Sequence, residues 1–164
     1  MRGKGVAMRI ALTSIFAALY ASLTIALAPI SFYEIQVRIS DSLLTLSILF
    51  GPPVIIGTSL GCFIANLIGP FGIIDALGGS IANLVATYIG WKLRKRRSFA
   101  LVQMPITVSL IVSAYLHVLL NLPILIVFLY LLAGSVVSID IMGLFLLRVI
   151  ETRYSGHNMH DFKQ

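Results

Sequence analysis

The longest apolar stretch of the chain, residues 123–149, is PILIVFLYLLAGSVVSIDIMGLFLLRV. Asp140 is its one acidic residue, and about 20 apolar residues suffice for a helix to cross a bilayer. The whole chain of 164 residues has the same character: 59% are hydrophobic, 11% are charged, and the mean hydropathy is +1.00. Soluble domains are about 45–50% apolar and about a quarter charged. The sequence therefore predicts an integral membrane protein.

Turns that contain proline or glycine, together with one basic run, divide the remaining chain into further apolar segments. Because lipid offers the backbone no hydrogen-bond partner, we expect each segment to be helical. The sequence predicts an all-α membrane protein, a six-transmembrane-helix bundle in one membrane domain (1–153), with a cytoplasmic polar tail (154–164). The second and third helices are short, so they form either a thin, tilted hairpin that turns at Gly51 or a re-entrant pair. The predicted spans are about 8–28, 38–50, 53–68, 74–92, 99–120 and 123–149.

Basic residues gather in three groups, and an excess of Lys and Arg marks the cytoplasmic side of membrane helices. An even number of crossings separates each group from the next, so all three groups share one side. The N and C termini are then cytoplasmic, and the connections near 29–37, 69–73 and 120–123 face outward. The net charge of +6 is thus an orientation signal with contact to membrane lipid, and we expect no binding of nucleic acid. The groups are Arg2 with Lys4 and Arg9, residues 92–97, and Arg148 with Arg153.

The basic start and the apolar segment behind it resemble a signal peptide, but that segment is as long as a span and is followed by others. We therefore interpret it as a retained first helix. The one cysteine, Cys62, excludes an internal disulfide and a Cys-based metal site, and we expect no metal and no cofactor. The sequence contains none of the hydrolase, metalloprotease or nucleotide-binding motifs, so we do not expect an enzyme.

Most of the remaining polar side chains fall within about two helical turns of the predicted outer face. Ionisable groups at membrane depth are costly and usually mark a site. We therefore predict a substrate-binding site at this face. Its candidates are Glu34, Gln36, Arg38, Asp41, Asn66, Asp75, His117 and Asn121.

Several of these candidates have a simpler structural interpretation as well. Glu34 lies in a loop, where hydration alone accounts for it. Gln36 and Arg38 alternate with apolar residues, which predicts an extended segment whose polar edge faces inward. Asp41 and Asp75 each lie where a helix cap is expected, because a carboxylate there accepts backbone N–H groups.

The same ambiguity holds for the polar residues inside the helices. Asn66 and Asn83 need hydrogen-bond partners, which a neighbouring helix can supply. His117 and Asn121 are four residues apart, so the sequence predicts that they share one helical face. Asp140 lies halfway along its helix, where it must pair, be neutral, face water or couple the movement of an ion.

Small residues line the first helix, and such residues let membrane helices approach closely. These small residues are explained either by packing within the bundle or by a face on which another membrane protein docks. Two alternative sets are present: the row Ala7, Ala11, Ser14, Ala18, Ala21 and Ala28, and the pair Ala17 and Ala21.

Three stretches carry a resemblance to a known family: APISFYEIQVRISDSL (28–43), LGCFIANLIG (60–69) and GIIDALGGSIANL (72–84). They resemble the QueT family, the substrate-binding S components of energy-coupling factor (ECF) transporters for queuosine precursors in the prokaryotic cell membrane. The resemblance implies a six-helix subunit that holds its ligand near the outer face. It also implies docking, through Ala17 and Ala21 or the competing Ala11–Ser14–Ala18 row, onto an ECF transmembrane scaffold subunit driven by two cytoplasmic ATPases. The family often has Glu where this chain has Asp41.

The implied ligand, a 7-deazaguanine such as the 7-aminomethyl or 7-cyano compound, presents adjacent N–H donors and one carbonyl acceptor. Carboxylates with an amide or a guanidinium suit that edge. Asp41, Asp75 and Glu34 are the candidate carboxylates; the amide and cation candidates are Gln36, Arg38, Asn66 and Asn121, and Phe32, Tyr33 and Phe71 are candidates for stacking. The alternatives are an S component for another vitamin such as cobalamin, an autonomous proton-coupled secondary transporter that uses Asp140 and His117, and a purely structural membrane subunit.

Overall fold

The computed structural model describes residues 2–32 and 36–154, and every regular element in these two ranges is helical. The predicted all-α class is confirmed. The first half contains α1 (Arg2–Ala26), α2 (Ala28–Ser31), the 3₁₀-helix η1 (Ile39–Leu46), α3 (Ser47–Phe50) and α4 (Pro52–Ile68). The second half contains α5 (Gly72–Lys92), α6 (Arg97–Leu120), α7 (Ile124–Ser135), the π-helical segment η2 (Val136–Met142) and α8 (Gly143–Tyr154).

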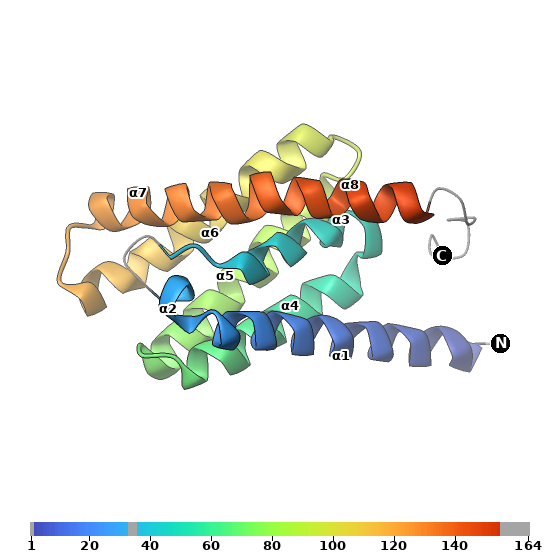
Figure 1. Cartoon of the computed structure of the whole chain (residues 1–164), viewed down its shortest axis with the longest axis horizontal. Coiled ribbons are helices and arrows are strands. Elements are labelled where there is room, and N and C mark those ends of the chain that lie inside the picture. The colour runs from blue at the N-terminus through green and yellow to red at the C-terminus, as the bar shows by residue number, and fades with distance from the viewer. Residues whose placement is uncertain (1, 33–35, 155–164) are drawn as a thin grey trace.

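The helices run side by side and form one elongated bundle (Figure 1). The start of α1, the end of α8 and the α5–α6 connection lie toward one end, whereas the α1–α2, α4–α5 and α6–α7 connections lie toward the other. The elements that carry the three basic groups thus lie toward one end of the bundle, and the side of the membrane that this end faces stays a prediction. Four helical stretches are long and apolar enough to cross a membrane: Gly5–Ala26, Gly72–Lys92, Arg97–Leu120 and Ile124–Arg153.

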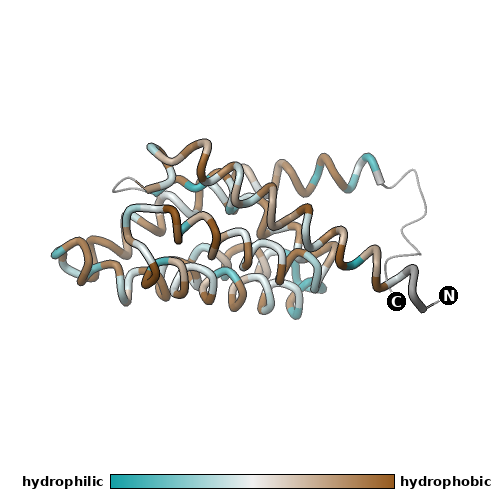
Figure 2. The backbone as a smooth tube through the Cα atoms, turned by 90° about the horizontal axis from the view of Figure 1, so that it is seen from below, coloured by the Kyte–Doolittle hydropathy of each residue, from teal (hydrophilic) through white to brown (hydrophobic). Residues whose placement is uncertain are grey.

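Hydrophobic residues continue along the whole length of the tube in Figure 2, and many of them point outward. Ile10, Ile68 and Phe145, for example, are 62%, 68% and 72% exposed. An apolar surface of this extent fits a lipid environment and is rare on soluble monomers.

The short second segment is a 3₁₀-helix, and two of its hydroxyl side chains bond backbone carbonyls three residues back. Ser42 Oγ donates to the Ile39 carbonyl at 2.7 Å, and Thr45 Oγ1 donates to the Ser42 carbonyl at 2.8 Å. A 3₁₀-helix rises about 2.0 Å per residue, more than an α-helix. Residues 36–50 therefore reach about 30 Å, the thickness of the hydrocarbon core, although they are few.

The predicted turn at Gly51 is confirmed. Gly51 has a φ of 61°, which favours glycine, and a Cβ there would lie 2.7 Å from Trp91 Nε1. Pro52 then occupies the first turn of α4, where its missing N–H costs nothing.

The elements α7, η2 and α8 form one continuous helical rod. Every fourth residue of this rod is buried: Val127, Leu131, Ser135, Ile139, Gly143 and Leu147. An α-helix has 3.6 residues per turn, so a spacing of four would drift around its surface. The wider π-helical turns of η2 compensate for this drift and keep one face toward the bundle. At Gly143 the rod approaches η1 so closely that a Cβ would lie 2.5 Å from Thr45 Cγ2.

Helix α1 packs closely on α4 through glycines. A Cβ at Gly57 would lie 2.7 Å from the Thr13 carbonyl oxygen, and a Cβ at Gly61 would lie 2.5 Å from the Ala17 carbonyl oxygen. Ala21 is buried and Ala17 is half-buried. This pair therefore lies on the side of α1 that packs on α4, and its proposed contact with a partner stays a prediction.

The competing row of small residues on α1 does face outward. Ala7, Ala11, Ser14 and Ala18 are all exposed. Residue 18 is one position from residue 17, and one position corresponds to about 100° around an α-helix. The two rows thus lie on different faces of α1.

Candidate ligand site

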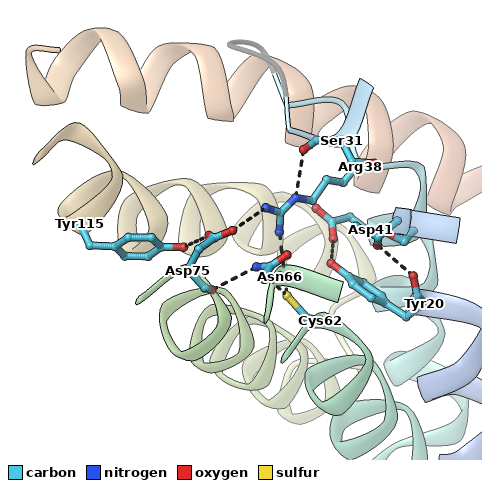
Figure 3. A network of polar contacts seen from close by, with 10 residues as sticks. Tyr20, Ser31, Arg38, Asp41, Cys62, Asn66, Asp75 and Tyr115 are labelled. Carbon is cyan, nitrogen blue, oxygen red and sulfur yellow. Dashed lines mark hydrogen bonds and ion pairs between the residues drawn. The ribbon is translucent and has the colours of Figure 1, made fainter. Parts of the chain in front are cut away.

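Buried polar side chains from five elements meet near the end of the bundle that carries the α4–α5 turn (Figure 3). The short connection between α4 and α5 places the last turn of α4 opposite the first turn of α5. We call these residues the polar network. Its members are Tyr20 and Thr24 on α1, Arg38, Ser40 and Asp41 at the start of η1, Cys62 and Asn66 on α4, Asp75 on α5, and Tyr115 on α6.

Arg38 lies at the centre of the polar network. Its Nη2 is 3.6 Å from Asp75 Oδ2, and its Nε donates to the Ser31 carbonyl at 3.4 Å. Its Nη1 is 3.9 Å from Cys62 Sγ, and its guanidinium stands 5.3 Å from the centre of the Phe32 ring. Because Arg38 stays charged and is 6% exposed, Asp75 supplies the opposite charge that its burial requires.

Asp75 joins three helices, and it is fully buried. Its Oδ1 accepts a hydrogen bond from the Tyr115 hydroxyl at 2.7 Å, and its backbone carbonyl accepts one from Asn66 Nδ2 at 3.1 Å. The capping interpretation of Asp75 is wrong, because Phe71 occupies the N-cap position of α5. The carboxylate still lies in the first turn, where the helix dipole favours a negative charge.

Asp41 lies at the other end of the polar network and pairs with α1. The Tyr20 hydroxyl donates to Asp41 Oδ1, and Thr24 Oγ1 lies 2.7 Å from Ser40 Oγ. The capping interpretation of Asp41 is also wrong: Arg38 is the N-cap residue of η1, and Asp41 lies within its first turn. Both contacts connect η1 to α1.

Three buried atoms of the polar network have no hydrogen-bond partner in the described part of the chain: Arg38 Nη2, Asn66 Oδ1 and Asp75 Oδ2. The 3.6 Å between Nη2 and Oδ2 makes an ion pair but is too long for a hydrogen bond. A buried polar atom without a partner costs about 1–3 kcal/mol. The three atoms are one donor and two acceptors, so a polar molecule with donors and an acceptor can satisfy all of them.

A family model described as QueT transporter matches residues 10–152 of the chain. The chain belongs to the QueT transporter family. The matched range extends from α1 into α8, and thus covers the whole bundle. No curated protein and no solved structure matches the chain. The chain is therefore a multi-pass membrane protein of a transporter family.

Four of the predicted site residues are members of the polar network: Arg38, Asp41, Asn66 and Asp75. Gln36 lies two residues before Arg38 and is buried. The expected alternation is confirmed, because Gln36 and Arg38 are buried whereas Val37 is half-buried. Glu34 and Tyr33 lie outside the described residues.

The other two candidates, His117 and Asn121, are not members of the polar network. Asn121 ends α6 in the left-handed conformation, with a φ of 53°, and it is exposed. His117 is half-buried and makes no recorded bond to the described residues of the polar network. The backbone N–H of Asn121 still donates to the His117 carbonyl, and the shared face of these two side chains stays a prediction.

Sequence reasoning missed the tyrosines. Tyr20 and Tyr115 each bond a carboxylate of the polar network. A signal was present: a tyrosine inside an apolar helix has a hydroxyl that needs a partner. Asn83, by contrast, lies deeper on α5, and its buried Nδ2 has no partner in the described chain.

Proposed function

We propose that the QueT protein is the substrate-binding S component of an ECF transporter, and that the polar network binds a 7-deazaguanine precursor of queuosine. The observation that carries this proposal is the set of three buried atoms without partners. Asp75 Oδ2 and Asn66 Oδ1 are acceptors for the two adjacent N–H donors of the guanine edge, and Arg38 Nη2 is a donor for its carbonyl oxygen. A charged donor or acceptor roughly doubles the strength of such bonds.

The charges of the polar network support the aminomethyl compound over the cyano compound. Asp41 and Asp75 carry two negative charges and Arg38 carries one positive charge, so the described network has one negative charge in excess. A ligand with one positive charge neutralises that excess inside a medium that stabilises charge poorly. Asp41 is the carboxylate that does not pair directly with Arg38, which makes it the proposed partner of the aminomethyl group.

The proposed orientation follows from the same arrangement. The polar network lies near the end of the bundle that is opposite to the termini and to the basic residues 92–97. With the basic end in the cytoplasm, the network faces outward, where a precursor arrives. Ala11, Ser14 and Ala18 are then the proposed docking face for the ECF scaffold subunit, in place of Ala17 and Ala21, since this row is exposed.

Ligand binding to the purified protein tests the substrate. We expect 7-aminomethyl-7-deazaguanine to bind without any nucleotide, with a Kd below roughly 10 μM, and the 7-cyano compound to bind more weakly. Asn66→Ala and Asp75→Asn should weaken both ligands, whereas Asp41→Asn should weaken mainly the aminomethyl compound. A matched control is Asn83→Ala, because Asn83 lies deeper on α5. Binding of neither compound below roughly 10 μM would overturn the substrate.

A further inference from the structure

Asp140 is the acidic residue of the described chain whose side chain neither accepts a hydrogen bond nor forms an ion pair there. Asp41 accepts a hydrogen bond from Tyr20, Asp75 pairs with Arg38, and Glu151 Oε1 lies 2.6 Å from Arg97 Nη2. Asp140 Oδ1 is buried and has no hydrogen-bond partner in the part of the chain that the structure describes. The polar network does not include Asp140.

Asp140 lies at the middle of the longest apolar stretch, Ile124–Arg153, which has 30 residues. Helix ends are therefore about 20 Å away on either side, too far for the short aspartate side chain to reach the membrane surface. A charged carboxylate at this depth costs about 2.5–3.5 kcal/mol. The sequence accepts this cost at a position where an apolar residue would avoid it.

The position on the helix shows where the carboxylate is directed. Ile139, the preceding residue, is fully buried, and the following residue, Ile141, is 63% exposed. Asp140 thus lies at the border between the face that packs in the bundle and the face that lipid or a partner contacts. It also belongs to η2. Although π-helical turns are rare in proteins, those that occur are often located at functional sites.

The surface beside Asp140 is apolar. Val136, Val137, Ile141 and Phe145 are all exposed there. Water is therefore a poor partner for the carboxylate, and lipid tails offer none. A cation that arrives on another transmembrane helix is the partner that complements it.

We propose that Asp140 is a contact point for the scaffold subunit, which presents a basic side chain to it at mid-membrane depth. This proposal rests on the proposed S-component function. The exposed apolar residues around Asp140 supply the packing surface. The carboxylate determines how the two helices align along their length and selects a partner that carries a basic side chain. The contact extends docking beyond the small residues of α1 to the α7–η2–α8 rod.

The test uses the full-length protein in lipid nanodiscs and the purified energy-coupling module, which contains the scaffold subunit and both ATPases. The affinity of the module is measured for the wild type and for Asp140→Asn, Asp140→Leu and Asp140→Lys. We expect affinity to fall in that order, with Asp140→Leu about 3- to 20-fold weaker, the range for one polar contact between membrane helices. Ile141→Ala is the matched control and should change the affinity less than about twofold.

The melting temperature of each variant alone should be no lower than that of the wild type, because the carboxylate stabilises nothing within the isolated protein, and the affinity for 7-aminomethyl-7-deazaguanine should be unchanged. Assembly of Asp140→Leu and Asp140→Lys at wild-type affinity would overturn the proposal, because the carboxyl would then be neutral and face lipid. A lower melting temperature of Asp140→Asn and Asp140→Leu without the module would overturn it too, since the role would be internal. A wild type that never assembles with the module would overturn the S-component function itself.

Discussion

Replacement of Asp75 by asparagine is expected to destabilise the QueT protein strongly. Asp75 Oδ2 lies 3.6 Å from Arg38 Nη2, and the two side chains are 0% and 7% exposed. Removal of one partner of a buried ion pair costs about 3–5 kcal/mol, because the other charge stays buried without compensation. One kcal/mol corresponds to roughly 2–4 °C in Tm for a chain of this size. Asp75→Asn should therefore unfold about 6–20 °C below the wild type.

A double-mutant cycle separates the ion pair from other effects of this substitution. Arg38→Met removes the positive charge and keeps a long apolar side chain. The double variant Arg38→Met/Asp75→Asn should be more stable than the two single losses predict, by at least about 1 kcal/mol, because neither charge is then left unpaired. Tyr115→Phe is the matched control: it removes a hydrogen bond to the same carboxylate but keeps its charge, and should cost about 1 kcal/mol.

The assay is thermal and denaturant unfolding of the purified variants in one detergent, followed by circular dichroism. Two results would refute the reasoning. One is an Asp75→Asn variant that melts within about 2 °C of the wild type, which corresponds to a loss below about 1 kcal/mol. The other is simple additivity in the cycle, since the two charges would then not stabilise each other.

Three further predictions concern the rest of the bundle. Asn66→Ala should lower affinity for the 7-deazaguanine about tenfold or more in a titration, because the ligand loses an acceptor; an unchanged Kd would remove Asn66 from the site. Ala18→Trp should block assembly with the energy-coupling module in a pull-down and leave ligand binding intact, whereas Ala21→Trp should lower the melting temperature of the isolated protein. Gly61→Val should cost about 1–3 kcal/mol by pushing α1 from α4, whereas Gly5→Ala, where nothing lies within 4 Å, should be neutral in the same melting assay.

The helices themselves follow from the sequence because the bilayer leaves the backbone few choices. Long apolar runs predict α5 and α6 within two residues of their observed limits, and Gly51 marks the turn before α4. The 3₁₀ geometry of η1 could not be predicted from apolarity, since it accompanies tertiary contacts such as that of Thr45 with the Gly143 carbonyl. The π-helical η2 likewise depends on tertiary contact, because only packing on η1 and α6 requires a spacing of four.

The candidate site was harder to predict than the helices because it depends on which faces meet. Arg38 and Asp75 were predicted from their charge at membrane depth, where few alternatives to a site or an ion pair exist. Tyr20 and Tyr115 were missed because tyrosine is common in membrane helices for reasons other than binding. That Ala17 packs against Gly61 could not be predicted, since small residues occur on both faces of α1.

The energetics of the polar network argue for binding over a purely structural function. A bundle that had only to pack would gain from apolar residues of similar volume at Arg38 and Asp75, because such replacements of buried ion pairs are often neutral or stabilising. Arg38 Nη2 and Asp75 Oδ2 form an ion pair but no hydrogen bond, and the buried Asn66 Oδ1, which has no hydrogen-bond partner in the described chain, costs about 1–3 kcal/mol. A ligand that bonds to all three recovers this free energy at the moment it binds. The affinity is thus expected to be greatest for a ligand whose donors, acceptor and charge all match those of the polar network.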